Sequence, residues 1–180
     1  QLANLEYDDG GKLSATGKVV NELLQTVNQL PYFAAPYPKS LDNQWVRNNL
    51  VKTYLEYPAS VEDRLRTAVE QLAEQTVSSL LQVIKKEGLS PKNFRMLATG
   101  GGVFNSFLME RIEVLFAANE AAKLRNIKLE IVIPDTSIIE FKEALIFGFL
   151  GVLKLRNEVN CLKTVTGASK NHSSGKIFLS

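Results

Sequence analysis

The amino-acid sequence predicts an α/β fold with several long helices, and three observations support this prediction. The second half alternates strand, helix, strand and helix patterns, an order that favours parallel strands joined by right-handed crossovers. The first half holds one long amphipathic helix pattern that begins after Ser60. The glycine run Gly100–Gly102 separates the first strand from its helix and permits a sharp turn. The 180 residues suffice for one large domain or two small ones.

The first part of the chain reads as helices separated by turns. Asp-Gly and Gly-Gly within segment 7–11 predict a turn, because glycine adopts positive φ at little cost. Apolar residues at helical spacing predict helices over 17–30 and 42–55. Segment 31–40 holds three prolines and three aromatic residues, and we expect an ordered, extended connector there. Trp45 and Tyr54 are expected to pack under this connector.

The next helix has the clearest start and stop signals. Ser60 precedes Glu62 and Asp63 in a capping-box-like arrangement, and Gly88 with Pro91 ends the apolar stripe. The spacing predicts a helix of about 28 residues, roughly 42 Å long.

The remaining elements follow in alternation. Strands are predicted over 94–99 and 128–133, the second closed by Pro134. Helices are predicted over 105–122 and 138–155. Segment 175–179 is expected to add an edge strand.

Composition excludes several classes of protein. With 21 basic and 19 acidic residues the net charge is only +2, and no basic run exceeds Lys85–Lys86, so nucleic acid is not an expected partner. The apolar stretch 144–153 is shorter than the roughly 20 residues that span a bilayer. A single cysteine and a single histidine, Cys161 and His172, leave no disulfide framework and no predicted metal site. We therefore expect a soluble, cytoplasmic protein without a membrane partner.

The glycine run is the one segment with chemical content. Gly100, Gly101 and Gly102 would let the backbone approach a ligand without interference from Cβ atoms. The following helix offers unpaired amides and the positive end of its dipole, which suits a phosphate. Asn105 is placed to cap this helix or to bind a ligand oxygen. The alternative is a tight strand-to-helix turn with no ligand.

Six segments, in order along nearly the whole chain, resemble the C-terminal part of the anhydro-N-acetylmuramic acid kinases. These are sugar kinases of the actin/Hsp70-like ATPase superfamily. After Ser40 the chain departs from the family, because Leu41–Trp45 stands where a Thr-Gly-containing turn is expected. The matching segments are Tyr7–Val19, Leu30–Phe33, Pro38–Ser40, Gly100–Asn105 with Leu108–Met109, Glu143–Ala144 and Val165–Ala168.

The resemblance implies that residues 1–180 form the C-terminal lobe of a two-lobed kinase with a ribonuclease H-like fold and a mixed sheet. It implies that Gly100–Gly102 and Asn105 bind the nucleotide. The family's catalytic Asp lies in an Asp-Thr-Gly-Pro-Gly-Asn-like segment, which these 180 residues lack. Residues 1–5 read as the last turn of a helix without an initiator Met. We interpret the chain as a fragment that is inactive alone, with no catalytic residue of its own.

The resemblance also implies the reaction. An ATP-dependent kinase with Mg²⁺ would open the 1,6-anhydro ring of the amino sugar and phosphorylate it during peptidoglycan recycling, and the enzyme would be a homodimer. Glu143 is the carboxylate expected near the sugar, its alternative being a helix-start acid. Two other functions stay open: a non-catalytic nucleotide-binding or interaction module, and a kinase for a different sugar.

Overall fold

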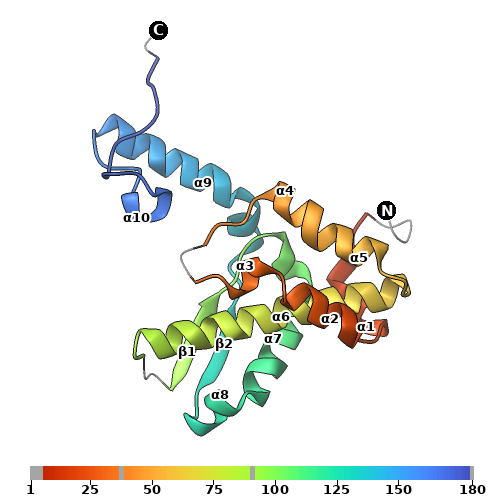
Figure 1. The fold of residues 1–180 in the computed structure, drawn as a ribbon. Helices are drawn as coiled ribbons and strands as arrows, with labels where there is room; N and C mark the ends of the chain where they lie inside the picture. Colours follow the sequence, from red (N-terminus) through yellow and green to blue (C-terminus); the bar gives the residue numbers. More distant parts are fainter. Residues whose placement is uncertain (1–5, 37–38, 90–91, 179–180) are drawn as a thin grey trace. The chain divides into compact units, whose positions relative to one another are not determined.

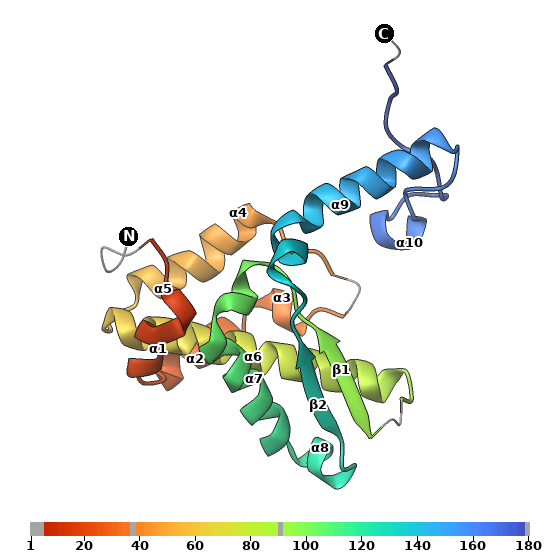
Figure 2. The same cartoon turned by 180° about the vertical axis from the view of Figure 1, so that it is seen from behind.

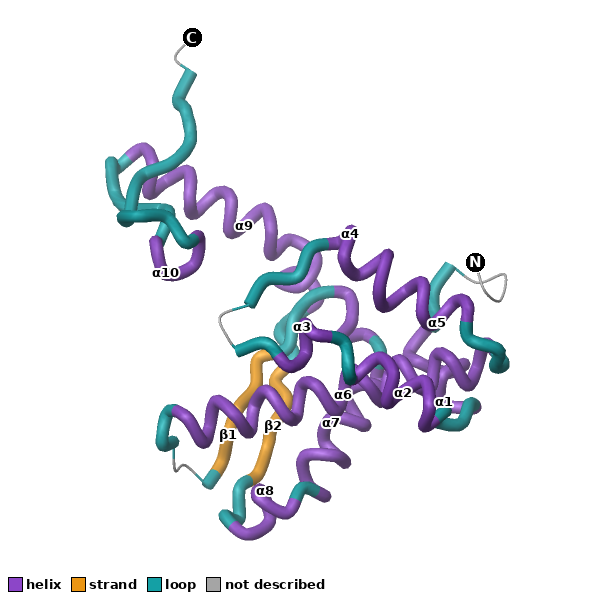
Figure 3. Tube along the Cα trace, in the orientation of Figure 1, coloured by secondary structure: helices purple, strands orange, loops and turns teal. Residues whose placement is uncertain are grey.

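The computed structural model describes residues 6–36, 39–89 and 92–178. The chain divides into two compact units, Gln1–Pro134 and Asp135–Ser180. Segment 1–5, predicted to end a helix, lies outside the described residues. The elements of the described residues are drawn in Figures 1 and 3: η1 Asp9–Gly11, α1 Lys12–Thr16, α2 Asn21–Asn28, α3 Pro31–Ala34, α4 Asn43–Trp45, η2 Val46–Val51, α5 Lys52–Glu56, α6 Val61–Lys86, β1 Asn93–Leu97, η3 Gly101–Phe104, α7 Ser106–Ala118, α8 Glu120–Leu124, β2 Lys128–Val132, α9 Thr136–Leu155 and α10 Lys163–Thr166.

The long helix α6 confirms the start and stop signals of the sequence. The Ser60 hydroxyl accepts a hydrogen bond from the amide of Asp63 at 3.1 Å, which satisfies one of the unpaired amides of the first turn. Gly88 adopts a φ of 61° just beyond the last turn, a conformation that glycine reaches without steric cost. The helix spans 26 residues, or about 39 Å.

The strands β1 and β2 pair in parallel, as the order of elements predicts. Asn93 lies opposite Lys128 at one end, and Leu97 lies opposite Val132 at the other. Among the described residues this sheet has two strands, so the mixed sheet implied by the resemblance is not seen there. The prediction of an edge strand in segment 175–179 is wrong for residues 175–178, where Gly175 has a φ of 91°.

The hydrophobic core lies between one face of the sheet and the helices α6, α7 and α8. Side chains alternate between the two faces of the sheet along each strand. The face that points to these helices, the inner face, carries Phe94, Met96, Leu129 and Ile131. In Figure 2 the sheet is seen in front of α6, which covers this face. The outer face carries an ion pair between Arg95 and Glu130 at 3.2 Å. The buried core residues are Ala73, Val77, Ile84, Ile112, Phe116, Ala122 and Ile127.

The segment before α2 is extended, although a helix was predicted from residue 17. Its backbone amides bind α6 instead: Lys18 donates to the carboxylate of Asp63 at 2.7 Å, and Val20 donates to the hydroxyl of Thr67 at 2.9 Å. The bond from Lys18 lowers the pKa of the Asp63 carboxyl. Gly17 approaches α6 so closely that a Cβ atom would lie 2.1 Å from the carbonyl oxygen of Glu62.

The connector is not extended throughout, because Pro31–Ala34 forms the short helix α3 with proline in its first turn. The packing predicted for Trp45 is confirmed, since its ring lies 5.2 Å from that of Tyr32 and 6.5 Å from that of Phe33. Lys39 is tied to this helix and donates to the carbonyl groups of Tyr32 and Phe33 at 3.1 and 3.3 Å.

The helix predicted over 105–122 is interrupted at Asn119, which has extended backbone angles. Its side-chain oxygen accepts from the amide of Ala121 at 3.0 Å and so caps a second helix, α8. The apolar pattern runs on across this break, which is why the sequence indicates one helix.

In the second unit, α9 begins two residues earlier than predicted and ends where expected, at Leu155. An isolated antiparallel bridge joins Cys161 to His172, and both residues are half-buried. None of the helices in the described part of the chain is long and apolar enough to cross a membrane.

Candidate functional site

The candidate site is the turn between β1 and α7. Gly100 has φ 95° and ψ 168°, a conformation that is accessible essentially to glycine alone. The next residues form the single 3₁₀ turn η3, closed by a hydrogen bond from the amide of Val103 to the carbonyl of Gly100 at 3.1 Å. The backbone geometry of the turn therefore requires glycine at position 100.

Gly101 and Gly102 have a different explanation. Both are exposed, and a Cβ atom added to either would meet nothing within 4 Å. Neither has a positive φ. Neither packing nor backbone conformation therefore demands glycine at these positions. What the two glycines provide is a stretch of exposed backbone without side chains ahead of a helix. Such a stretch suits the close approach of a phosphate.

Asn105 closes the turn and starts α7. Its side-chain oxygen accepts from the amide of Leu108 at 2.9 Å, so the predicted capping role is confirmed. Its side-chain nitrogen forms no hydrogen bond with any described residue and keeps its capacity to donate. Gly100, Gly101, Gly102 and Asn105 therefore lie together, with the helix dipole of α7 behind them.

A distant loop, for which local sequence predicts a turn, supports the start of α7. The hydroxyl of Ser106 donates to the carbonyl of Gly10 at 3.0 Å, across 96 positions of sequence. At Gly11, where φ is 77°, a Cβ atom would lie 2.2 Å from the side-chain oxygen of Asn105 and 2.7 Å from Cβ of Phe107. The loop itself is held by Asp8, whose carboxylate accepts from the amides of Leu13 and Ser14.

An ion-pair cluster locks α7 against α6. Glu70, 7% exposed, accepts two hydrogen bonds from the guanidinium of Arg111, at 2.9 and 2.7 Å. This pairing raises the pKa of the Arg111 guanidinium. Arg66 lies 3.5 Å from the same carboxylate, and its guanidinium covers the ring of Phe107 at 4.8 Å. Local sequence patterns do not indicate the pairing of α7 with α6, because Glu70 and Arg111 are 41 positions apart.

Glu143, the predicted sugar-binding residue, belongs to the second unit. It is exposed and occupies the eighth position of α9. No acidic residue lies in the first turn of this helix. The alternative interpretation of Glu143 as a helix-start acid is therefore wrong, because the effect of the dipole fades within the first turn.

The described residues contain no group of three or more His, Cys, Asp or Glu side chains that could hold a metal ion. Mg²⁺ bound to a nucleotide needs only one or two protein carboxylates, since the phosphates supply other ligands.

Two parallel strands, with a glycine turn leading from the first of them into a capped helix, make this chain an α/β protein. A sequence model of the anhydro-N-acetylmuramic acid kinase family matches residues 1–180. The chain belongs to this family.

Individual members of this family are similar to the chain over nearly its whole length. An anhydro-N-acetylmuramic acid kinase of Saccharophagus degradans is 33% identical over 178 residues, covering 96% of this chain and 43% of the relative. One from Sulfurovum sp. is 30% identical over 181 residues, covering 98% of this chain and 44% of the relative. One from Actinobacillus pleuropneumoniae serotype 5b is 30% identical, with 96% and 44% covered. The chain thus spans less than half the length of these relatives.

Proposed function

We propose that residues 1–180 form the nucleotide-binding, C-terminal lobe of an ATP-dependent kinase that opens and phosphorylates 1,6-anhydro-N-acetylmuramic acid in peptidoglycan recycling. The family and its kinase relatives support the class of reaction. The observation that carries the nucleotide-binding role is the bare backbone of Gly101 and Gly102 ahead of α7. The whole enzyme would act in the cytoplasm as a homodimer.

In this proposal the residues of the turn bind and position the phosphates of ATP. The backbone of Gly101 and Gly102 lies against the phosphate oxygens, and the dipole of α7 favours their negative charge. The free side-chain nitrogen of Asn105 donates to a phosphate oxygen, while its oxygen caps the helix. Mg²⁺, held chiefly by the nucleotide, would neutralise part of the phosphate charge. The sugar would be oriented by Glu143.

Substituting Gly101 tests the nucleotide site. In the full-length protein, we expect Gly101→Val to weaken ATP binding at least tenfold, since its side chain would keep the phosphates away from the backbone. The melting temperature should barely change, because a Cβ atom there meets nothing within 4 Å. Isothermal titration calorimetry with ATP measures the affinity, and Gly148→Val, in equally open space on α9, is the control. Unchanged affinity would leave the glycine run as a structural turn.

Substituting Glu143 tests the sugar site separately. We expect Glu143→Gln in the full-length enzyme to lower kcat/KM for the anhydro sugar at least tenfold, which corresponds to about 1.4 kcal/mol. A charge-assisted hydrogen bond to the sugar would be lost, whereas ATP affinity should stay the same. Glu140→Gln, on the same helix, is the matched control. Normal turnover by Glu143→Gln would return the sugar contacts to other parts of the enzyme.

The chain alone is expected to be inactive, because its sequence lacks a segment like that of the family's catalytic Asp. Transfer of labelled phosphate from ATP to 1,6-anhydro-N-acetylmuramic acid measures this, with the Saccharophagus degradans kinase as positive control. Phosphorylation by the 180-residue chain would contradict the prediction. A full-length protein that binds ATP but phosphorylates no sugar would favour a non-catalytic module, and one that prefers another sugar would correct the substrate.

A further inference from the structure

A groove of about 580 Å³ opens between the C-terminal half of α6 and the helices α7 and α8. This volume falls within the range of roughly 300–1,000 Å³ that is typical of small-molecule sites. Its apolar lining includes Val77 and Ile84, which are buried in the core, and Leu81 and Leu115, which are half-buried. Half of the lining residues are polar or charged, but most of the exposed lining surface is apolar, so the groove suits an apolar ligand body.

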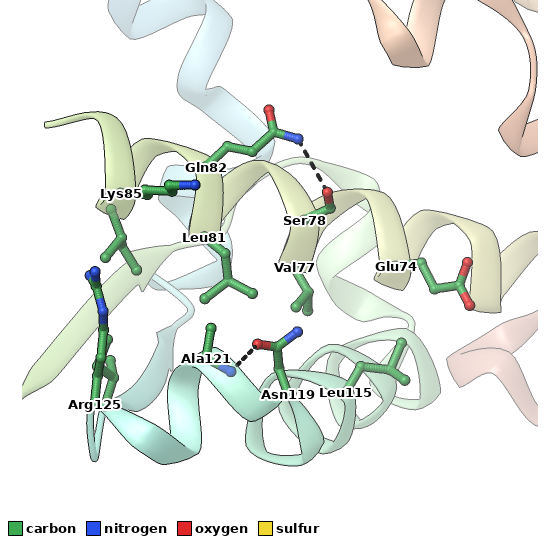
Figure 4. A pocket seen from close by; sticks show the side chains of 12 residues that line it. Glu74, Val77, Ser78, Leu81, Gln82, Lys85, Leu115, Asn119, Ala121 and Arg125 are labelled. Carbon is green, nitrogen blue, oxygen red and sulfur yellow. Dashed lines mark hydrogen bonds between the residues drawn. The ribbon is translucent and has the colours of Figure 1, made fainter.

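The charges around the groove are unevenly distributed. Lys85 and Arg125 lie together at one end, whereas Glu74 lies at the other (Figure 4). Glu74 already accepts a hydrogen bond from the side-chain amide of Asn28 at 2.9 Å. Lys85 and Arg125 are exposed, and neither has a side-chain hydrogen bond or ion pair with any described residue. Two unpaired cations at one end of an apolar groove complement an anionic group attached to an apolar body.

The groove is separate from the glycine turn. Lys85 precedes the start of β1, and Arg125 precedes the start of β2, so the cations lie near the amino ends of both strands. The glycine turn follows the carboxyl end of β1. Parallel strands place these two sites at opposite ends of the sheet. The groove is thus not part of the proposed nucleotide site.

We propose that this groove binds a small amphipathic carboxylate, with the carboxylate between Lys85 and Arg125 and the apolar chain over Leu81 and Leu115. Along α6 the lining runs from Glu74 to Lys85, about 16 Å at 1.5 Å per residue, which suits an extended aliphatic chain. The guanidinium of Arg125 can donate two parallel hydrogen bonds to the carboxylate. The lysine adds a second positive charge.

Fatty acids of different length are suitable probes for the 180-residue chain. Below their micellar concentrations, dodecanoate should bind more tightly than octanoate, because it buries more apolar surface. Dodecyltrimethylammonium, which carries the opposite charge, should bind at least tenfold more weakly than dodecanoate. Isothermal titration calorimetry measures all three. Absence of dodecanoate binding, or equal binding of the cationic amphiphile, would overturn the proposal.

A charge reversal locates the site. Arg125→Glu should weaken dodecanoate binding at least tenfold, whereas Lys170→Glu, with the same change in net charge at an exposed loop of the other unit, should leave it unchanged. Circular dichroism checks that both variants fold. Equal effects of the two variants would overturn the proposal. So would a concentration-dependent dimer that Arg125→Glu dissociates, because the groove would then be an interface between copies of the chain.

Discussion

Glu70→Ala is expected to lower the free energy of unfolding of this chain by about 3–5 kcal/mol, the range found when one partner of a buried ion pair is removed. Glu70 is 7% exposed and accepts two hydrogen bonds from Arg111, with Arg66 at 3.5 Å. The substitution would leave two guanidinium groups mostly buried without their carboxylate. It would also loosen the packing of α7 on α6.

Chemical denaturation with urea measures this effect, and an exposed ion pair supplies the control. Glu56 lies 4.0 Å from Lys52, and both side chains are more than half exposed. Glu56→Ala should change stability by less than about 1 kcal/mol, as is usual for surface pairs. A double-mutant cycle of Glu70→Ala with Arg111→Ala should show strong coupling, because the two side chains share their hydrogen bonds. Equal losses for Glu70→Ala and Glu56→Ala would contradict a stabilising role of the buried cluster.

The features that the sequence predicts correctly have local causes. Ser60 and Asp63 are three positions apart, and so are Asn105 and Leu108, so each cap is visible in a short window of sequence. Parallel pairing follows from the order of the strands and the helices that connect them. The glycine run marks the turn because one of its residues, Gly100, adopts a backbone conformation that other residues avoid.

The features that the sequence misses depend on contacts between distant segments. Nothing local indicates that Gly10 accepts a hydrogen bond from Ser106, or that Glu70 pairs with Arg111. Residues 17–20 carry part of a helical pattern, yet their amides bind α6 and remain extended. Tertiary hydrogen bonds here outweigh a weak helical preference. The support of the candidate site is therefore less predictable than the turn itself.

Gly11→Ala is the second substitution with a large expected effect. The backbone of Gly11 has a φ of 77°, where a residue with a Cβ atom is strained by roughly 1–2 kcal/mol. The added Cβ atom would lie 2.2 Å from the side-chain oxygen of Asn105, so the loop or the cap of α7 must move. Loss of a helix cap costs about 1 kcal/mol more. We expect a total loss of at least about 2 kcal/mol, measured by urea denaturation.

Gly10→Ala separates the strain of the backbone from the clash. Gly10 also has a positive φ, 65°, but a Cβ atom there would meet the hydroxyl oxygen of Ser106 at an ordinary 3.5 Å. Its substitution should therefore cost less than that of Gly11. The double variant Gly11→Ala with Asn105→Ala should lose less stability than the sum of the single variants, because the second change removes the nearer obstacle. The 2.7 Å approach to Cβ of Phe107 would remain, so the recovery should be partial. Equal losses for Gly10→Ala and Gly11→Ala would show that close packing of this loop on the start of α7 contributes nothing, and that positive φ alone demands both glycines.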